Sequence, residues 1–151
     1  MRPYDKLIGN GLIAGVMMAH ILYPQMDPLP AGFAPFWIQR ELRSRLGFDG
    51  AVLSDDLSMK ATRRYGTMPE RARRALEAGC DMILVCNDRD AAQATVRALR
   101  DYSNPLSLVR LARLHGTGHL MRESLLASDE WRDTHAELSK WTEPPELELD
   151  A

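Results

Sequence analysis

The chain has 151 residues, 45% of them hydrophobic and 26% charged, which suits one ordinary folded domain. Its 19 Lys and Arg residues nearly balance 21 Asp and Glu residues, for a formal net charge of -2, which excludes a strongly basic nucleic-acid binder. No apolar run reaches the roughly 18 residues of a membrane-spanning helix, and the first residues lack the apolar stretch of a secretory signal. We therefore expect a cytoplasmic protein with no nucleic-acid and no membrane partner.

The cysteines and histidines do not form a recognisable metal-binding pattern. Cys80 and Cys86 are too few to bind a metal by themselves. A metal site would also need histidines at the sequence spacing that is typical of metal ligands. That spacing is absent among the four histidines, His20, His115, His119 and His135. We expect two reduced and largely buried thiols, no metal and no cofactor.

Three apolar runs predict the strands of a parallel sheet. They cover residues 13–20, 50–56 and 81–87, and none alternates cleanly between apolar and polar residues. Such runs are typical of parallel strands with both faces covered. Prolines and a glycine after the first run predict a long, ordered loop over residues 23–35.

Helices are predicted after each strand from their end signals. Pro35 suits the first turn of one helix and Gly47 its end. A capping-box pattern at Thr67 begins a second helix, which Gly79 ends. Further helices are predicted over residues 92–101, 106–114 and 130–138. Alternating strands and helices indicate an α/β fold with a parallel sheet and right-handed crossovers.

Reactive residues in parallel α/β folds lie at the C-terminal ends of strands. His20 ends the first run, and it suits a structural role as well as a site. The second run ends in Asp55 and Asp56, whose side chains should point to opposite faces because strand residues alternate. After the third run, Asp88 is best explained as the cap of the next helix. From spacing alone, the adjacent carboxylates could be a metal site, a phosphoacceptor, a general base or a glycosidase nucleophile.

At these residues the chain resembles a known family, the bacterial β-N-acetylhexosaminidases of glycoside hydrolase family 3, which act in cell-wall recycling. The resemblance is collinear from Arg2 to about Trp131 and covers the C-terminal part of the family's catalytic domain. The segments that carry it are RPY (2–4), MMAHILYP (17–24), DPLPA (27–31), LGFDG (46–50), SDDLSM (54–59) and AGCDMILVCN (78–87).

The resemblance implies part of a TIM-type (β/α)8 barrel, of about 250 residues when complete. It implies that the three strands are about the sixth, seventh and eighth of the barrel, followed by C-terminal helices. On this basis residues 1–128 are expected to form the partial barrel. Residues 129–151 are expected to form a C-terminal helix and an acidic, frayed tail.

The resemblance also implies an activity, the retaining hydrolysis of terminal β-linked N-acetylglucosamine from muropeptide fragments. Asp55 matches the catalytic nucleophile, Asp56 a supporting residue, and His20 a residue that lines the substrate pocket. The family's acid/base is a histidine, assisted by an aspartate, on an earlier loop whose motif is absent from these 151 residues. The isolated chain is therefore expected to have little or no activity.

Two other functions remain open from the sequence: a non-catalytic α/β module that binds a sugar or a cation, and an inactive remnant. Three parallel strands from one side of a barrel would leave unpaired edges and an uncovered interior face. We therefore expect the chain to associate with an N-terminal half-barrel, to self-associate, or to pack loosely.

Overall fold

The computed structural model describes residues 2–116, 118 and 121–141. The chain divides into two compact units, residues 1–115 and 116–151. The first unit is an α/β structure, as predicted, and holds every candidate site residue. Within the described residues no helix is long and apolar enough to cross a membrane.

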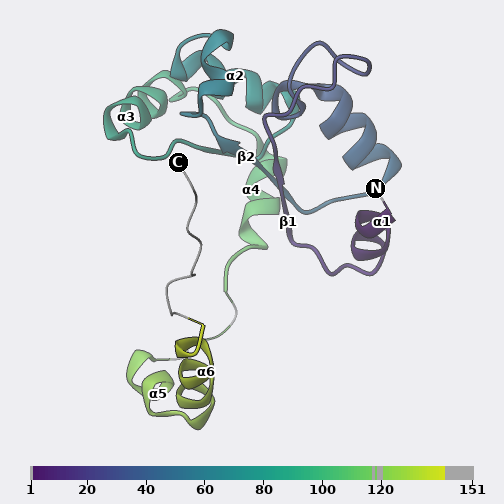
Figure 1. Ribbon diagram of the computed structural model, residues 1–151. Coiled ribbons are helices and arrows are strands. Elements are labelled where there is room, and N and C mark those ends of the chain that lie inside the picture. Colours follow the sequence, from purple (N-terminus) through teal and green to yellow (C-terminus); the bar gives the residue numbers. More distant parts are fainter. Residues whose placement is uncertain (1, 117, 119–120, 142–151) are drawn as a thin grey trace, which may run out of the picture. The chain divides into compact units, whose positions relative to one another are not determined.

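The first unit is built on three parallel strands, β1 (Gly15–Met18), β2 (Ala51–Asp56) and β3 (Met82–Leu84), in that spatial order. Figure 1 labels the first two of them. β1 pairs with β2 in regular register, from Gly15 opposite Ala51 to Met18 opposite Ser54. The pairing of β2 with β3 is parallel but irregular, with a register shift between Leu53 and Asp56. The predicted parallel sheet is confirmed.

Helices follow the strands where the end signals placed them. The predicted helix after the loop is observed as η2 (Phe36–Arg45), with π-helical hydrogen bonding, and the next as α2 (Met68–Ala78). The two that follow are α3 (Arg89–Ala98) and α4 (Pro105–Ala112). Three helical segments of this unit were not predicted: α1 (Arg2–Gly9), η1 (Ala31–Phe33) and η3 (Lys60–Tyr65).

The helix ends show why the local signals were reliable. Glu70 Oε2 accepts hydrogen bonds from the Thr67 backbone N–H at 2.7 Å and from its hydroxyl at 2.8 Å, which stabilises the start of α2. Gly79 ends α2 with a φ of 118°. Asp88 caps α3, since its Oδ1 accepts from the Ala91 N–H at 2.9 Å.

The core lies on one face of the sheet, between the strands and the helices η2 and α2. Ile38 of η2, Val52 of β2 and Ala72 of α2 are each fully buried in it. Leu42, Ala75 and Phe48 extend the same cluster. The helix-facing side chains thus anchor β2 at the centre of the sheet.

The opposite face of the sheet is open in the described structure. Met17 and Met82 lie on either side of Leu53 in the strand register and are 55% and 37% exposed. Runs of this kind are typical of strands covered on both faces, but the exposure of Met17 and Met82 agrees with the expectation that a partial barrel leaves its interior face uncovered. The core helices η2 and α2 pack on the other face. Successive side chains of a strand point to opposite faces, so every second residue of each strand points away from these helices.

The second unit contains two described helices, α5 (Arg122–Ala127) and α6 (Asp129–Ser139). α6 confirms the helix predicted over residues 130–138, and α5 was not predicted. Ser128 Oγ accepts from the Trp131 N–H at 3.1 Å and caps α6. His119 and the acidic tail at 142–151 lie outside the described residues.

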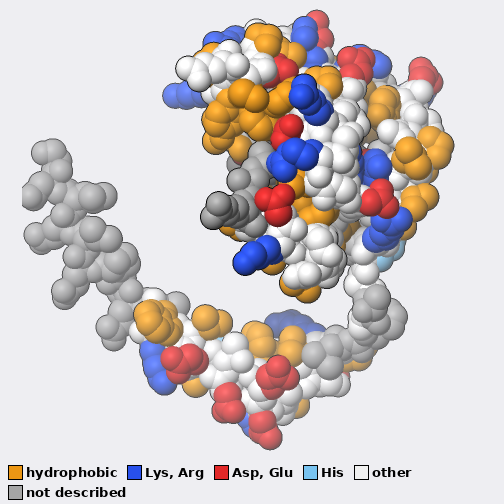
Figure 2. All heavy atoms as spheres, turned by 90° about the vertical axis from the view of Figure 1, so that its right-hand side faces the viewer, with side chains coloured by type: hydrophobic (Ala, Val, Ile, Leu, Met, Phe, Trp, Pro, Cys, Tyr) orange, Lys and Arg blue, Asp and Glu red, His pale blue; other side chains and the backbone are white. Residues whose placement is uncertain are grey.

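The described surface bears charges of both signs. On the face of the first unit shown in Figure 2, Lys and Arg side chains are interspersed with Asp and Glu side chains. This mixture agrees with the near-balance of charges in the sequence and with the absence of a dominant basic patch on that face.

Candidate functional site

The C-terminal ends of the three strands bring the candidate residues to one edge of the sheet. Because the strands are parallel, their C-terminal ends lie on the same side: Asp55 is near the end of β2, and His20 and Asn87 follow the ends of β1 and β3. The last register pair of β1 and β2 is Met18 opposite Ser54; Asp55 comes directly after that pair on β2, and His20 lies two residues beyond it on the other chain segment. The structure therefore brings together residues that are up to 67 positions apart in the sequence.

Asp55 belongs to the open face of the sheet. It lies two residues after Leu53 in β2, and residues two apart in a strand share a face. Its Oδ1 accepts a hydrogen bond from the Asp56 backbone N–H at 2.7 Å. In the part of the chain that the structure describes, no donor contacts its Oδ2. One carboxylate oxygen is thus held by a backbone donor, and the other has no donor among the described residues.

Asp56 belongs to the opposite, helix-covered face, and its carboxylate is fully engaged. Oδ1 accepts from the backbone N–H groups of Ser58 at 2.9 Å and Cys86 at 3.0 Å, and Oδ2 accepts from the Ser58 hydroxyl. Burial acts to raise the pKa of Asp56, but these hydrogen bonds and the nearby His20 outweigh it and lower the pKa overall. Asp56 therefore fastens the end of β2 to the segment after β3.

His20 is 8% exposed and lies behind the strand ends. Its ring packs 5.4 Å from the Phe33 ring, centroid to centroid. A Cβ on Gly32 would approach its Nδ1 to 3.2 Å, so a glycine keeps this space free for the imidazole. Both ring nitrogens are buried with no hydrogen-bond partner among the described residues.

The end of β3 contributes backbone geometry and a thiol. Asn87 has a φ of 60°, the only positive value among the described non-glycine residues, and turns the chain sharply toward α3. Cys86, just before it, is exposed, so the expectation that both thiols are largely buried is right for Cys80 and wrong for Cys86. Asp88 serves as the helix cap that the sequence predicted.

Two residues that shape the site were not identified from the sequence. Ser54 is fully buried, and its Oγ accepts from the Leu84 N–H at 3.0 Å, which joins β2 to β3 directly below the carboxylates. Gly32 makes room for His20 from a loop that the sequence marked only as long and ordered. Neither has a local signal, because both act on residues distant in the sequence.

The described residues contain no group of three or more His, Cys, Asp or Glu side chains that could hold a metal ion. A cavity of about 320 Å³ lies elsewhere, between α1, β1 and η2, and Asp55 does not line it. The site is therefore an open strand-end surface with one available carboxylate.

Comparisons with known proteins identify the family of the chain. Residues 1–113 match the family described as the glycosyl hydrolase family 3 N-terminal domain. The β-hexosaminidase of Thioalkalivibrio sulfidiphilus is 47% identical over 148 residues, which are 98% of this chain and 42% of that protein.

Solved structures of family 3 enzymes are also similar to this chain. The crystal structure of NagZ from Neisseria gonorrhoeae in complex with N-trifluoroacetyl-D-glucosamine is 34% identical, with a TM-score of 0.73. The match covers 94% of this chain and 41% of that one. A family 3 β-N-acetylglucosaminidase from Paenibacillus is 30% identical, with a TM-score of 0.69, over 91% of this chain and 30% of its own.

The chain spans about two fifths of the length of the β-hexosaminidase from Thioalkalivibrio. Similarity in sequence and in structure nevertheless extends over nearly all of this chain. The chain therefore belongs to glycosyl hydrolase family 3 and is similar to its β-hexosaminidases.

Proposed function

We propose that this chain supplies the nucleophile half of a retaining β-N-acetylhexosaminidase. In this proposal its three strands are about the sixth to eighth of a (β/α)8 barrel, with residues 1–128 as the partial barrel. Residues 129–151 would be a C-terminal appendage. Asp55 stands at a strand's C-terminal end, where barrel enzymes carry their catalytic residues.

The observation that carries the proposal is the unequal bonding of the two adjacent carboxylates. Asp56 has three donors on its two oxygens, whereas Asp55 has a single backbone donor on one oxygen within the described structure. The donor to Asp55 holds the carboxylate in place, and the second oxygen remains available on the open face. This is the arrangement that a positioned nucleophile requires.

The reaction proceeds in two steps. Asp55 attacks the anomeric carbon of a terminal β-linked N-acetylglucosamine, the glycosidic bond breaks, and the aglycone leaves with a proton from the acid/base. Water, deprotonated by the same acid/base, then cleaves the glycosyl-enzyme ester and releases the sugar with retained configuration. Asp56 positions the strand end, and His20 lines the pocket.

The acid/base belongs to the part of the family's polypeptide that this chain does not span. General acid–base assistance is worth about 10²–10⁴-fold, so the chain without that part should hydrolyse ordinary N-acetylglucosaminides very poorly. The substrate class is supported by the N-trifluoroacetyl-D-glucosamine complex of the Neisseria relative. Muropeptide fragments in the cytoplasm are the proposed natural source of this sugar.

The test compares this chain alone with the chain combined with the unmatched part of the Thioalkalivibrio β-hexosaminidase. We expect hydrolysis of an aryl N-acetyl-β-glucosaminide only in the combination. Asp55→Ala should abolish it, and Asp101→Asn, an exposed carboxylate on the same unit, should not. Activity that survives Asp55→Ala would refute the assignment. Saturable sugar binding with no hydrolysis in any combination would instead favour a non-catalytic sugar-binding module.

A cation-binding module is the weaker alternative. A divalent cation with oxygen ligands takes about six to eight of them, and the described residues bring no such group together.

A further inference from the structure

A group of exposed cations follows the strand that carries Asp55. Residues 57–76 contain six Lys and Arg residues and one acidic residue, Glu70, although the chain as a whole has a net charge of -2. Half of these cations belong to η3, which begins four residues after the end of β2, and their side chains are exposed. We call them the η3 basic surface, which consists of Lys60, Arg63 and Arg64.

The η3 basic surface has no acidic partner in the described structure. None of its three cations forms an ion pair with a described residue. The Glu70 carboxylate is already engaged, since its Oε2 accepts from the Thr67 N–H and hydroxyl. Exposed cations often form only a solvated face. Here, however, they belong to a segment that is held beside the candidate site.

Buried hydrogen bonds hold η3 at the end of β2. Thr62, in the middle of η3, is fully buried, and its Oγ1 lies 2.8 Å from the carbonyl oxygens of Leu57 and of Met59. Arg71 of α2 donates from Nη1 to the Leu57 carbonyl at 2.6 Å and to Thr62 Oγ1 at 2.9 Å. These contacts keep the exposed cations of η3 close to the strand end.

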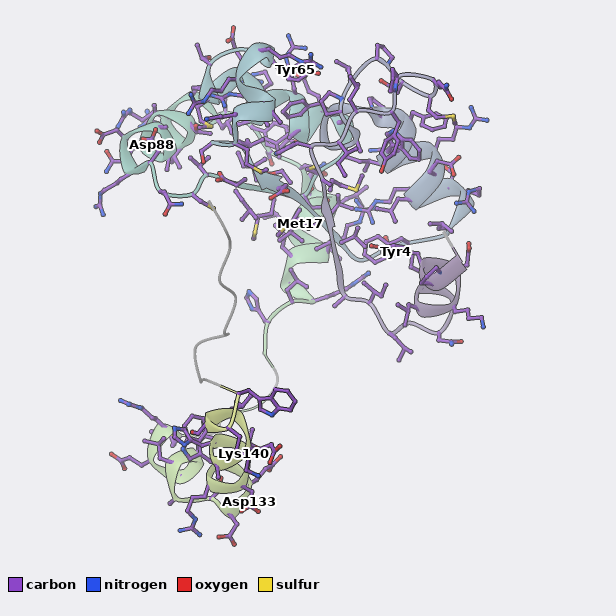
Figure 3. All side chains as sticks on the ribbon, in the orientation of Figure 1. Tyr4, Met17, Tyr65, Asp88, Asp133 and Lys140 are labelled. Carbon is purple, nitrogen blue, oxygen red and sulfur yellow. The ribbon has the colours of Figure 1, made fainter. Side chains whose placement is uncertain are left out.

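Aromatic contacts connect η3 to the candidate site. The Tyr65 ring packs 5.4 Å from that of Phe33, which packs 5.4 Å from the His20 ring, centroid to centroid. Figure 3 shows Tyr65, the last residue of η3, at the top of the first unit, the end toward which β1 runs. The Arg64 guanidinium lies 4.8 Å from the Tyr65 ring centroid and donates to its hydroxyl at 2.5 Å. Arg64 is therefore held on the side of the unit that carries the site.

The position of η3 suits recognition of the group that leaves, rather than of the sugar. Lys60 is five residues after Asp55, so the backbone between them spans at most about 18 Å. The terminal N-acetylglucosamine is uncharged and offers these cations no partner. An aglycone that bears a peptide extends away from the anomeric carbon and carries carboxylates.

We propose that the η3 basic surface binds a carboxylate of the aglycone and makes the site selective for anionic N-acetylglucosaminides. The planar guanidinium of Arg64, already ordered by Tyr65, suits bidentate carboxylate binding. Lys60 and Arg63 add positive charge around it. This inference rests on the proposed function, because the aglycone is the group that hydrolysis at Asp55 would release.

The first experiment measures KM for the chain combined with the unmatched part of the Thioalkalivibrio β-hexosaminidase. One substrate is an aryl N-acetyl-β-glucosaminide whose aryl group carries a diglutamyl peptide, and the other is its fully esterified, neutral form. The free acid should have a KM about threefold to tenfold lower at low salt, through several exposed charge pairs. The difference should vanish in about 0.5 M salt, which screens exposed charges.

Two double variants locate the effect. Lys60→Gln combined with Arg63→Gln should remove most of the difference in KM between acid and ester. The matched control, Arg97→Gln combined with Arg100→Gln, neutralises two exposed cations outside η3 and should leave the difference unchanged. Equal KM values for acid and ester in the unmodified chain, or equal losses in both double variants, would overturn the inference.

Binding separates this inference from the proposed function. If the combination hydrolyses neither compound, the proposed hydrolase is refuted, and an NMR titration of the 151-residue chain with the same acid and ester decides the inference. Binding of the acid at least about threefold more tightly than the ester would support the anion site. Absent or equal binding would overturn the inference, as would equally tight binding of the diglutamyl peptide without the sugar.

Discussion

Asp81 Oδ2 lies 2.7 Å from Arg43 Nη2, although the two residues are 38 positions apart. The Asp81 side chain is 1% exposed and that of Arg43 is 10% exposed. Three further donors contact the same carboxylate: the Val52 N–H at 2.8 Å, the Ser107 hydroxyl at 2.7 Å and Arg110 Nη1 at 3.3 Å. One buried carboxylate thus joins η2, β2 and α4 at the start of β3.

Replacing this carboxylate should strongly destabilise the fold. Asp81→Ala leaves the Arg43 guanidinium buried without its partner, and breaking a buried pair in this way costs about 3–5 kcal/mol. We expect a loss of that size in the free energy of unfolding, measured by urea denaturation. Asp49→Asn is the control, since its side chain is 67% exposed and pairs with arginines at the surface. Equal losses in both variants would contradict a special role for Asp81.

Asp56 should make stability depend on pH in the acid range. Its pKa is lowered from 3.8 because hydrogen bonds from Ser58 and Cys86, together with His20, outweigh the effect of burial. A carboxyl with a lower pKa in the folded state stabilises the fold above its unfolded pKa of about 3.9. That contribution is lost as the pH falls through the folded value.

The measurement is the free energy of unfolding of the wild type and of Asp56→Asn between pH 7 and pH 2. The difference between the two proteins should be constant near neutrality and shrink below about pH 4. A difference that stays the same down to pH 2 would show that the charge on Asp56 contributes nothing.

Gly79 should not tolerate a side chain. Its φ of 118° disfavours L-residues, and an added Cβ would lie 2.0 Å from Gln39 Nε2 and 2.9 Å from Ile38 Cγ2. Gly79→Ala is expected to lower the free energy of unfolding by more than about 1 kcal/mol. Gly9→Ala is the control, because a Cβ there meets no atom within 4 Å. Tolerance of both substitutions would refute the steric argument.

The two cysteines should differ sharply in reactivity. Burial, with a smaller contribution from Asp81, raises the pKa of the Cys80 thiol to about 12, whereas Cys86 is exposed. We expect the Cys86 thiol to react rapidly with an alkylating reagent in the native protein and the Cys80 thiol to react only after unfolding. Cys86→Ser should remove the rapid phase. Rapid labelling of Cys80 in that variant would indicate a loosely packed core.

The sequence by itself determined the features that depend on neighbouring residues. Thr67, Gly79 and Asp88 marked helix ends correctly because caps act over a few residues of backbone. The order of strands and helices predicted the parallel sheet, and the strand-end motifs identified the family. The strand periodicity also predicts that Asp55 and Asp56 point to opposite faces of β2.

Only the tertiary structure decided which of these carboxylates is engaged and which is available. The donors to Asp56 come from Ser58 and from Cys86, 30 positions away, and those to Asp81 come from three separate elements. The exposure of Met17 likewise depends on which sheet face the helices cover, and it agrees with the uncovered interior face expected of a partial barrel. The hydrophobic pattern of a sequence indicates whether a side chain favours a buried or an exposed position. Contacts between residues distant in the sequence decide which of the two it has in the fold.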